Sequence, residues 1–299
     1  MKIIFVAFFL NSHSEYFLSH NNCKEYSEYI DNVTDCATLQ KDLDELEKWA
    51  ETWNMRFHPN KCKVLRIGKN QCTFKYSMKS ENGRCELKEV ISEKDLGITV
   101  DNALNFEEHC KALVSKANRM LMMIRRNFEY LDRDMFLQLY KSLVRSHLEY
   151  GMEIWSPKLK GNVQLVESVQ RRATRMMPGM ENLDYEDRLK KLKLPTLVYR
   201  RHRGEMINVY KFMQGLWKVN EETLFPRATY HRTRGHNLKL FKQRADNSTR
   251  SHFFTVRVCD LWNELPEHVV NASSLNSFKN NLDAYWIDKP WLYQFRDNQ

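Results

Sequence analysis

The chain has 299 residues, with 47 basic and 38 acidic side chains, 42% hydrophobic residues, nine glycines and seven prolines. A chain of this length can bury one large core or two ordinary ones. Its low glycine and proline content excludes collagen-like and proline-rich proteins, and its hydrophobic fraction excludes a wholly disordered chain.

The positive charge is concentrated in the middle of the chain. Residues 1–110 carry 14 basic and 18 acidic side chains, a net charge of −4, whereas residues 111–250 carry 29 and 14, a net charge of +15. Residues 251–299 return to a net charge of −2. Such a field attracts polyanions, and nucleic acid is the first candidate. The alternative is that these cations lie on solvated helix faces that bind nothing. Charge alone does not distinguish the two interpretations.

Seven cysteines are present, and they form neither a Cys-x-x-Cys pair nor a Cys/His run at zinc spacing. Their number is odd and their spacing is loose. This pattern favours reduced, mostly buried thiols in a cytoplasmic or nuclear protein over a disulfide framework. We therefore expect no metal site built from these cysteines.

The N-terminus carries a short apolar run, residues 3–10, directly after Lys2, as a signal peptide does. It is followed by no Ala-x-Ala cleavage site, and no stretch of about 18 apolar residues that would span a membrane occurs in the chain. We expect an intracellular protein without a membrane span, in which this run is a buried strand or the product of a misplaced start. A secreted glycoprotein with three Asn-x-Ser/Thr sequons is the alternative.

Residues 35–100 are expected to combine one helix with a small antiparallel sheet. Apolar residues recur at steps of three and four after Asp35, which is placed to cap the helix. Residues 62–67 are typical of a strand, and the alternation on both sides of Asn82-Gly83 predicts a hairpin. A further strand is expected at residues 96–100. The apolar helix face comprises Leu39, Leu43, Leu46, Ala50 and Trp53.

The rest of the chain has helical periodicity. A helix after Asn105 has a buried stripe through Ile124, and a second begins near Asp132 and turns Phe136, Leu139, Tyr140 and Leu143 inward. Further helices are expected at residues 162–177, 185–192 and 196–214, followed by a loop at 220–250 and a last apolar group at 253–265 and 275–286. The predicted fold class is therefore α+β, a small sheet unit followed by a mostly helical part.

Three of the predicted helices carry cations suited to phosphate. Arg171 and Arg175 lie one turn apart, so two guanidinium groups can reach neighbouring phosphates. Tyr199 and Tyr210 flank the last cluster and either stack on bases or belong to the core. Binding led by charge would fall steeply with salt and would have low specificity. The candidate nucleic-acid-binding residues are Lys116, Arg119, Arg125, Arg126, Arg171, Arg172, Arg175, Arg200, Arg201 and Arg203.

No catalytic motif is evident in the residues themselves. The chain has neither a Gly-x-Ser-x-Gly sequence nor a glycine-rich phosphate loop. The acidic pairs Asp42 with Asp44 and Glu107 with Glu108 are explained by solvated helix faces.

A series of short motifs resembles the C-terminal part of reverse transcriptases from non-LTR retrotransposons, jockey-like elements in particular. They span about residues 23–286 in the order found in that family. The motifs are LQKDLD (39–44), WNM (53–55), NKC (60–62), KDLGITVD (94–101), IRRNFEYL (124–131), HLEYG (147–151), IWSP (154–157), VQRRAT (169–174), TRGH (233–236), WNELP (262–266) and LNSFK (275–279).

The resemblance implies a right-handed polymerase with fingers, palm and thumb. On this basis residues 1–34 are an atypical N-terminus, 35–101 the C-terminal part of the palm, 102–150 the helical thumb and 151–299 a basic helical tail. Residues 94–101 would form a primer-grip hairpin, with Asp95, Leu96 and Gly97 as the primer-grip-like residues.

The chain departs from the family at the catalytic carboxylates. The family's RNA-directed DNA synthesis uses two Mg²⁺ ions about 3.5–4 Å apart, held by one upstream Asp and an Asp pair. No upstream palm or fingers are present, and the Asp-Asp position falls on Asn21-Asn22, whose neutral oxygens cannot balance the charge of the metals. Alternatively residues 1–20 are unrelated sequence from a spurious start, and this match is accidental. In both cases we expect no catalytic residue and no cofactor.

Three functional hypotheses follow. The first is a truncated, inactive reverse-transcriptase-like chain that keeps RNA or DNA binding through the basic helices of residues 111–250. The second is a domesticated nucleic-acid-binding or scaffold protein with a protein partner. The third is a retrotransposon relic, in which Ile98 and Val100 leave an open sheet edge unless residues 3–10 cover it.

Overall fold

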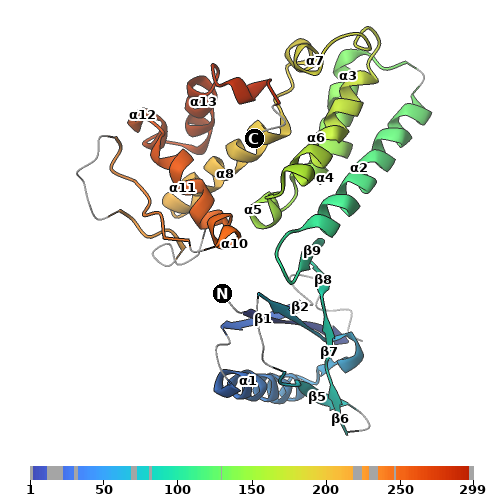
Figure 1. Cartoon of the computed structure of the whole chain (residues 1–299), viewed down its shortest axis with the longest axis vertical. Coiled ribbons are helices and arrows are strands. Elements are labelled where there is room, and N and C mark those ends of the chain that lie inside the picture. Colours follow the sequence, from blue (N-terminus) through green and yellow to red (C-terminus); the bar gives the residue numbers. More distant parts are fainter. Residues whose placement is uncertain are drawn as a thin grey trace. The chain divides into compact units, whose positions relative to one another are not determined.

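In the computed structural model the chain forms two compact units, residues 1–106 and 107–299. The first contains most of the strands and the second consists mainly of helices (Figure 1). The mixed architecture agrees with the predicted α+β class. The structure describes residues 3–11, 23–29, 33–68, 73–80, 83–128, 130–217, 224–228, 235–245 and 247–295, the first two segments by their backbone alone.

The N-terminal unit is organised around one sheet in which β1 is a central strand. The strands run in the order β2-β1-β4-β7, with β3 also paired to β1. β1 is antiparallel to β2, β3 and β4, whereas β4 and β7 are parallel. The bounds are β1 (Ile3–Asn11), β2 (Cys23–Tyr29), β3 (Arg56–Phe57), β4 (Lys63–Ile67) and β7 (Lys88–Val90).

Of the two predictions for the apolar run of residues 3–10, one is confirmed and one is wrong. A strand is confirmed there, because β1 spans the run. The expected neighbour is wrong, since β1 pairs with β4 from Ile3 opposite Ile67 to Ala7 opposite Lys63, and it does not pair with the strand of Ile98 and Val100. That strand, β9 (Ile98–Asp101), has its own partner in β8 (Ser92–Asp95).

Two hairpins complete the unit. β5 (Ser77–Ser80) and β6 (Gly83–Glu86) pair on either side of residues 81–82, which confirms the predicted hairpin. The strand expected at residues 96–100 begins only at Ile98, because Leu96 and Gly97 form the two-residue turn between β8 and β9. Their φ angles are +43° and +87°, and a hairpin turn with both central residues at positive φ matches the twist of the paired strands.

Helix α1 (Val33–Thr52) supplies the core beneath this sheet. Its buried side chains Leu39 and Leu43 belong to one apolar cluster with Val64 of β4 and with Tyr76. The helix is confirmed, but it begins two residues before Asp35, which therefore lies in the first turn. Trp53, expected on the buried face, lies beyond the helix end and is 65% exposed.

The C-terminal unit is built from the remaining helices, which Figure 1 shows from green to red. Short turns of 3₁₀-helix occur in both units, as η1 (Pro59–Lys61) and η3 (Pro290–Leu292). The helices are α2 (Glu107–Asn127), α3 (Arg133–Leu139), the π-helical η2 (Tyr140–Arg145), α4 (Ser146–Glu149), α5 (Met152–Trp155), α6 (Lys160–Arg175), α7 (Tyr185–Leu192), α8 (Leu197–Met213), α10 (Ser248–Ser251), α11 (Phe254–Asn263), α12 (Glu267–Val270) and α13 (Leu275–Tyr285).

Most of the predicted helices of this unit are confirmed to within two residues. Asp132 caps α3 by accepting a hydrogen bond from the Met135 amide at 2.8 Å, and Thr196 caps α8 by accepting one from the Tyr199 amide at 3.0 Å. Within the predicted loop of residues 220–250, the described part contains an isolated bridge between Arg227 and Leu240 and the start of α10.

One predicted face is wrong in the middle of the second helix. Leu143, expected to face inward, is 36% exposed, whereas Val144 is fully buried. The segment η2 is π-helical, and a π turn contains one residue more than an α turn. The extra residue rotates the following side chains about the helix axis, so that Val144 faces the core in place of Leu143.

The core of the C-terminal unit lies between α8, α11 and α13, where Trp262, Phe278 and Trp286 are almost completely buried. Tyr199 and Tyr210 belong to the same cluster. The Tyr199 hydroxyl donates to Asp283 at 3.1 Å and the Tyr210 hydroxyl to the Ala272 carbonyl at 2.7 Å. These two rings are therefore core residues, and the suggestion that they stack on bases is wrong.

Among the residues that the structure describes, five cysteines are not part of a disulfide, and four of them are buried. In the same residues, no helix combines the length and apolar character needed to cross a membrane.

Replacement of Leu39 by Ala tests the packing of α1. Leu39 is completely buried, so its truncation is expected to lower the free energy of unfolding of the N-terminal unit by about 2–5 kcal/mol. Hydrogen exchange of the amides of residues 33–52 and 63–67 measures this unit separately. Glu45→Ala, at an exposed position of α1, is the control and should change exchange little; equal effects of the two variants would contradict the packing.

Candidate nucleic-acid interface

Helix α2 presents an uncompensated positive face. Its other face is buried through Cys110, Ala117, Leu121 and Ile124, among others. In the part of the chain that the structure describes, no ion pair with a carboxylate is formed by the four exposed cations of this face. These are Lys116, Arg119, Arg125 and Arg126.

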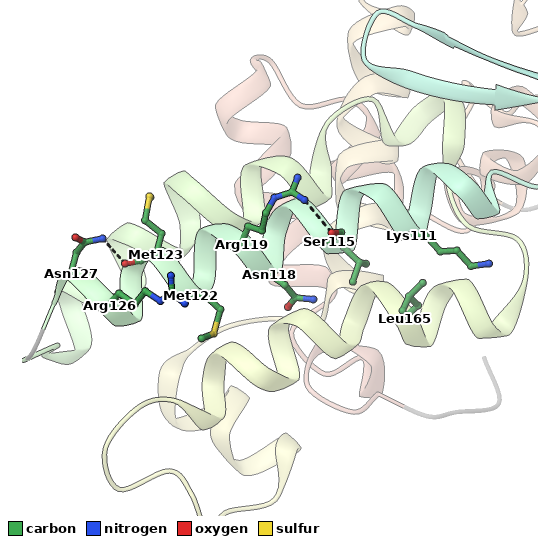
Figure 2. A pocket seen from close by; sticks show the side chains of 10 residues that line it. Lys111, Ser115, Asn118, Arg119, Met122, Met123, Arg126, Asn127 and Leu165 are labelled. Atoms are coloured by element: carbon green, nitrogen blue, oxygen red, sulfur yellow. Dashed lines mark hydrogen bonds between the residues drawn. The ribbon is translucent and has the colours of Figure 1, made fainter.

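An open groove of about 910 Å³ runs along α2 and reaches Leu165 of α6. Figure 2 shows Asn118 and Met122 pointing from α2 toward α6, with Arg119 on another side of the helix, where it donates to the Ser115 hydroxyl at 3.3 Å. Met122 is 41% exposed. The groove thus combines guanidinium groups with thioether and amide side chains, which suits a ligand that has both charged and apolar parts.

The second exposed group of cations lies on α6. Arg171, Arg172 and Arg175 are exposed, and none of them has a carboxylate partner among the described residues. The inward face of the same helix carries Val169 and Ala173. Since α2 and α6 pack against one another, these arginines and the cations of α2 belong to one helical layer.

The third group of predicted cations, on α8, is placed differently. Arg200 makes a bidentate pair with Glu149, with N–O distances of 2.7 and 2.8 Å, and Arg203 makes one with Asp283, with distances of 2.5 and 2.7 Å. Arg201 is only 7% exposed. Two of these arginines are neutralised by carboxylates inside the unit and the third is buried. The three residues are therefore not part of the candidate interface.

The sequence gives no local sign of these pairs. Glu149 lies 51 residues from Arg200, and Asp283 lies 80 residues from Arg203. Helical spacing shows that three arginines share a helix, but the carboxylates that neutralise them are brought there by the tertiary fold.

A buried carboxylate near these arginines was not singled out by sequence reasoning. Glu205 of α8 is 3% exposed, with Arg257 Nε at 2.8 Å and His202 Nδ1 at 3.4 Å. Burial alone would raise the pKa of Glu205, but the hydrogen bonds and charges of His202 and Arg257 outweigh it and bring the pKa to about 2. This carboxylate is ionised and structural.

The predicted primer-grip residues lie in the turn between β8 and β9. Asp95 ends β8, and burial raises the pKa of its carboxyl group, while Leu96 is 62% exposed. The hairpin exists as expected, but a role in gripping a primer stays a prediction. Asn21 and Asn22, at the possible Asp-Asp position, lie outside the described residues.

The reverse transcriptases that this chain resembles hold two magnesium ions between carboxylates. Within the described segments, no three His, Cys, Asp or Glu side chains come together in a way that could hold a metal ion. The described residues therefore do not fit a two-metal centre.

Comparison with known proteins gives two transposon matches from Drosophila melanogaster. The RNA-directed DNA polymerase from mobile element jockey is 30% identical over 167 residues, which are 53% of this chain and 18% of that protein. The probable RNA-directed DNA polymerase from transposon BS is 28% identical over 148 residues, 46% of this chain and 15% of that protein. This chain contains a region like a non-LTR retrotransposon reverse transcriptase.

An uncharacterized protein of Caenorhabditis elegans is also similar, with 27% identity over 110 residues, 36% of this chain and 56% of the worm protein. The chain spans less than a fifth of each of the two transposon polymerases that it matches. No protein-family model and no solved structure matches it. The likeness supports the resemblance expected from the motifs, and it covers about half of the chain.

The low pKa of Glu205 predicts a pH effect on stability. Its pKa is about 2 in the folded unit and 4.5 ordinarily, so its contribution is fully present above pH 4.5 and is lost as the pH falls toward 2. Between pH 5 and pH 2 the wild-type unit should lose on the order of 3 kcal/mol more of its free energy of unfolding than Glu205→Gln. Urea unfolding at several pH values measures this. Glu264→Gln, at an exposed position, should behave as wild type; parallel pH profiles for wild type and Glu205→Gln would exclude the effect.

Proposed function

We propose that the C-terminal unit binds RNA or DNA through contacts between the exposed cations of α2 and α6 and the phosphate backbone. The observation that carries this proposal is a set of seven exposed cations on two packed helices without carboxylate partners among the described residues. They are Lys116, Arg119, Arg125, Arg126, Arg171, Arg172 and Arg175.

The α8 arginines provide the internal comparison. Arg200 and Arg203 show that this unit supplies carboxylates where an arginine serves the fold. Cations that serve only the fold would be expected to have such partners, because like charges without partners repel one another and oppose compaction. Among the described residues, the seven cations of α2 and α6 have no such partner, and an anionic ligand would relieve the repulsion.

The relatives support the same class of ligand. Two of them are named as RNA-directed DNA polymerases of transposons, which act on nucleic acids. Contacts to phosphates carry no sequence information by themselves, so binding by this surface has low sequence specificity and a strong dependence on salt. Met122 in the groove of α2 adds an apolar contact for a sugar or base.

Reversal of two charges in the groove tests the interface. Arg119→Glu with Arg126→Glu should weaken binding of a 20-nucleotide single-stranded RNA at least tenfold at 100 mM salt, since each reversal removes an attractive charge and adds a repulsive one. The slope of log affinity against log salt should become shallower by about 1.4, since each lost phosphate contact contributes about 0.7 for a single strand. Fluorescence anisotropy at 50–200 mM salt measures both quantities.

The control is Lys279→Glu with Lys289→Glu, which changes the net charge equally on and after α13. This control should lose less than threefold. Equal losses in the two double variants would show that net charge alone attracts RNA, and salt-independent binding would point to an apolar protein-type surface.

DNA synthesis by this chain alone is not part of the proposed function. The catalytic chemistry needs carboxylates to hold two metal ions, and the sequence carries Asn21-Asn22 at the possible Asp-Asp position. In a primer-extension assay with Mg²⁺ or Mn²⁺, the purified chain should therefore incorporate no nucleotide on a primed RNA template. An active reverse transcriptase serves as the positive control, and template-dependent incorporation would refute the expectation.

A further inference from the structure

The end of α6 lies against α7 and the segment that follows η3, and three arginines meet there. Arg171 and Arg175 are exposed, whereas Arg188 of α7 is only 6% exposed. Two aromatic rings belong to the same corner, Tyr185 at the start of α7 and Phe295 near the end of the described chain.

The guanidinium of Arg171 is packed against both rings. Its central carbon lies 5.0 Å from the centroid of the Tyr185 ring and 5.5 Å from that of the Phe295 ring. Arginine stacks on aromatic rings through the faces of its planar group, and its N–H donors lie in the plane. Stacking therefore leaves the donating edge of the exposed Arg171 side chain for a ligand.

The two rings are held by contacts inside the unit. The Tyr185 hydroxyl donates to Glu167 at 2.6 Å and accepts from the Gln170 amide at 3.2 Å. The segment before Phe295 is tied to the start of α8, because Thr196 donates from its amide to the Leu292 carbonyl at 2.9 Å. The position of Arg171 is thus set before any ligand arrives.

The charge of the corner is positive and only partly balanced. Arg188 is fixed by donating to the Thr174 hydroxyl at 3.2 Å. Burial lowers the pKa of Arg188, and the positive charges of Arg175 and Arg171 lower it further, so the three groups repel one another. Tyr185 and Asp184 oppose this effect. The buried carboxylate of Glu167 accepts hydrogen bonds from Tyr185 and from the Leu197 amide. Burial raises the pKa of Glu167, while these bonds and the charges of Arg201 and Arg171 lower it, so Glu167 balances part of the positive charge.

We propose that Arg171 and Arg175 form a phosphate-ester subsite, in which the stacked guanidinium of Arg171 binds a nucleic-acid phosphate edge-on by two parallel N–H···O bonds. The subsite rests on the proposed nucleic-acid binding and adds to it a preferred ligand geometry. Arg175, one turn further along α6, supplies a second donor to the same or the next phosphate. A lysine at position 171 would keep the charge but lose the planar fork.

A simpler role for these arginines is to stabilise α6, because cations in the last turn of a helix interact favourably with its dipole. That role depends on charge alone. Replacement of arginine by lysine therefore separates the two explanations, since it keeps the charge and removes the fork.

The first experiment compares Arg171→Lys with Arg227→Lys, an exposed arginine outside α2 and α6, for binding of the same 20-nucleotide RNA at 100 mM salt. Arg171→Lys should lose five- to tenfold in affinity with an unchanged salt slope, whereas Arg227→Lys should change less than twofold. Phe295→Leu, which removes one stacking ring and keeps every charge, should lose about threefold. Thermal melting within 2 °C of wild type shows that the variants are folded. Equal affinities of Arg171→Lys and Arg227→Lys would overturn the subsite.

The second experiment uses inorganic pyrophosphate as the probe, so that the subsite and the proposed function can fail separately. The arginine Nε resonance of Arg171 should shift with saturation on titration, and that of Arg227 should shift little. Saturation at Arg171 in a chain that binds no RNA would support the subsite and refute the proposed function. RNA binding without a shift at Arg171 would support the function and refute the subsite.

Discussion

The C-terminal unit depends on the pairing of buried and half-buried charges around α8. A charge taken out of water is costly unless a partner of opposite sign accompanies it, and loss of one partner costs more than the pair itself gains. Arg200 with Glu149, Arg203 with Asp283 and Arg257 with Glu205 meet this requirement. They join α8 to α4, α13 and α11, so the central helix is held in one position relative to its neighbours.

The same requirement explains why the surface of α2 and α6 is positively charged. Because the carboxylates near α8 pair with arginines, the exposed cations of α2 and α6 have no carboxylate partner among the described residues. The sequence alone shows the charge excess of residues 111–250 but not this division. Arg171 and Arg200 look alike as members of helical basic clusters, and only the packing shows that one is exposed against aromatic rings and the other is paired with Glu149.

The fold could be predicted wherever one residue's environment follows from its neighbours in sequence. Periodicity was sufficient for α1, α3 and α8, although the expected cap Asp35 lies inside α1, and the Asn82-Gly83 hairpin follows from its turn residues. Sequence patterns were insufficient where the backbone departs from the regular period. Leu96 adopts a positive φ that its side chain disfavours, and the π turn of η2 exchanges Leu143 for Val144. Strand neighbours were also beyond reach, because β1 could pair with any open edge and its partner β4 lies more than fifty residues along the chain.

The hydrogen bonds between Thr196 and the segment of η3 have a consequence for synthesis. Thr196, which caps α8, donates from its hydroxyl to the Trp291 carbonyl, 95 residues further along the chain, and from its amide to the Leu292 carbonyl. During translation, α8 therefore leaves the ribosome long before the residues whose carbonyl groups accept the hydrogen bonds of Thr196 have been synthesised. The corner of Tyr185 and Arg171 can assemble only after residues 291–295 have emerged, so this part of the unit matures late in translation and not as each helix appears.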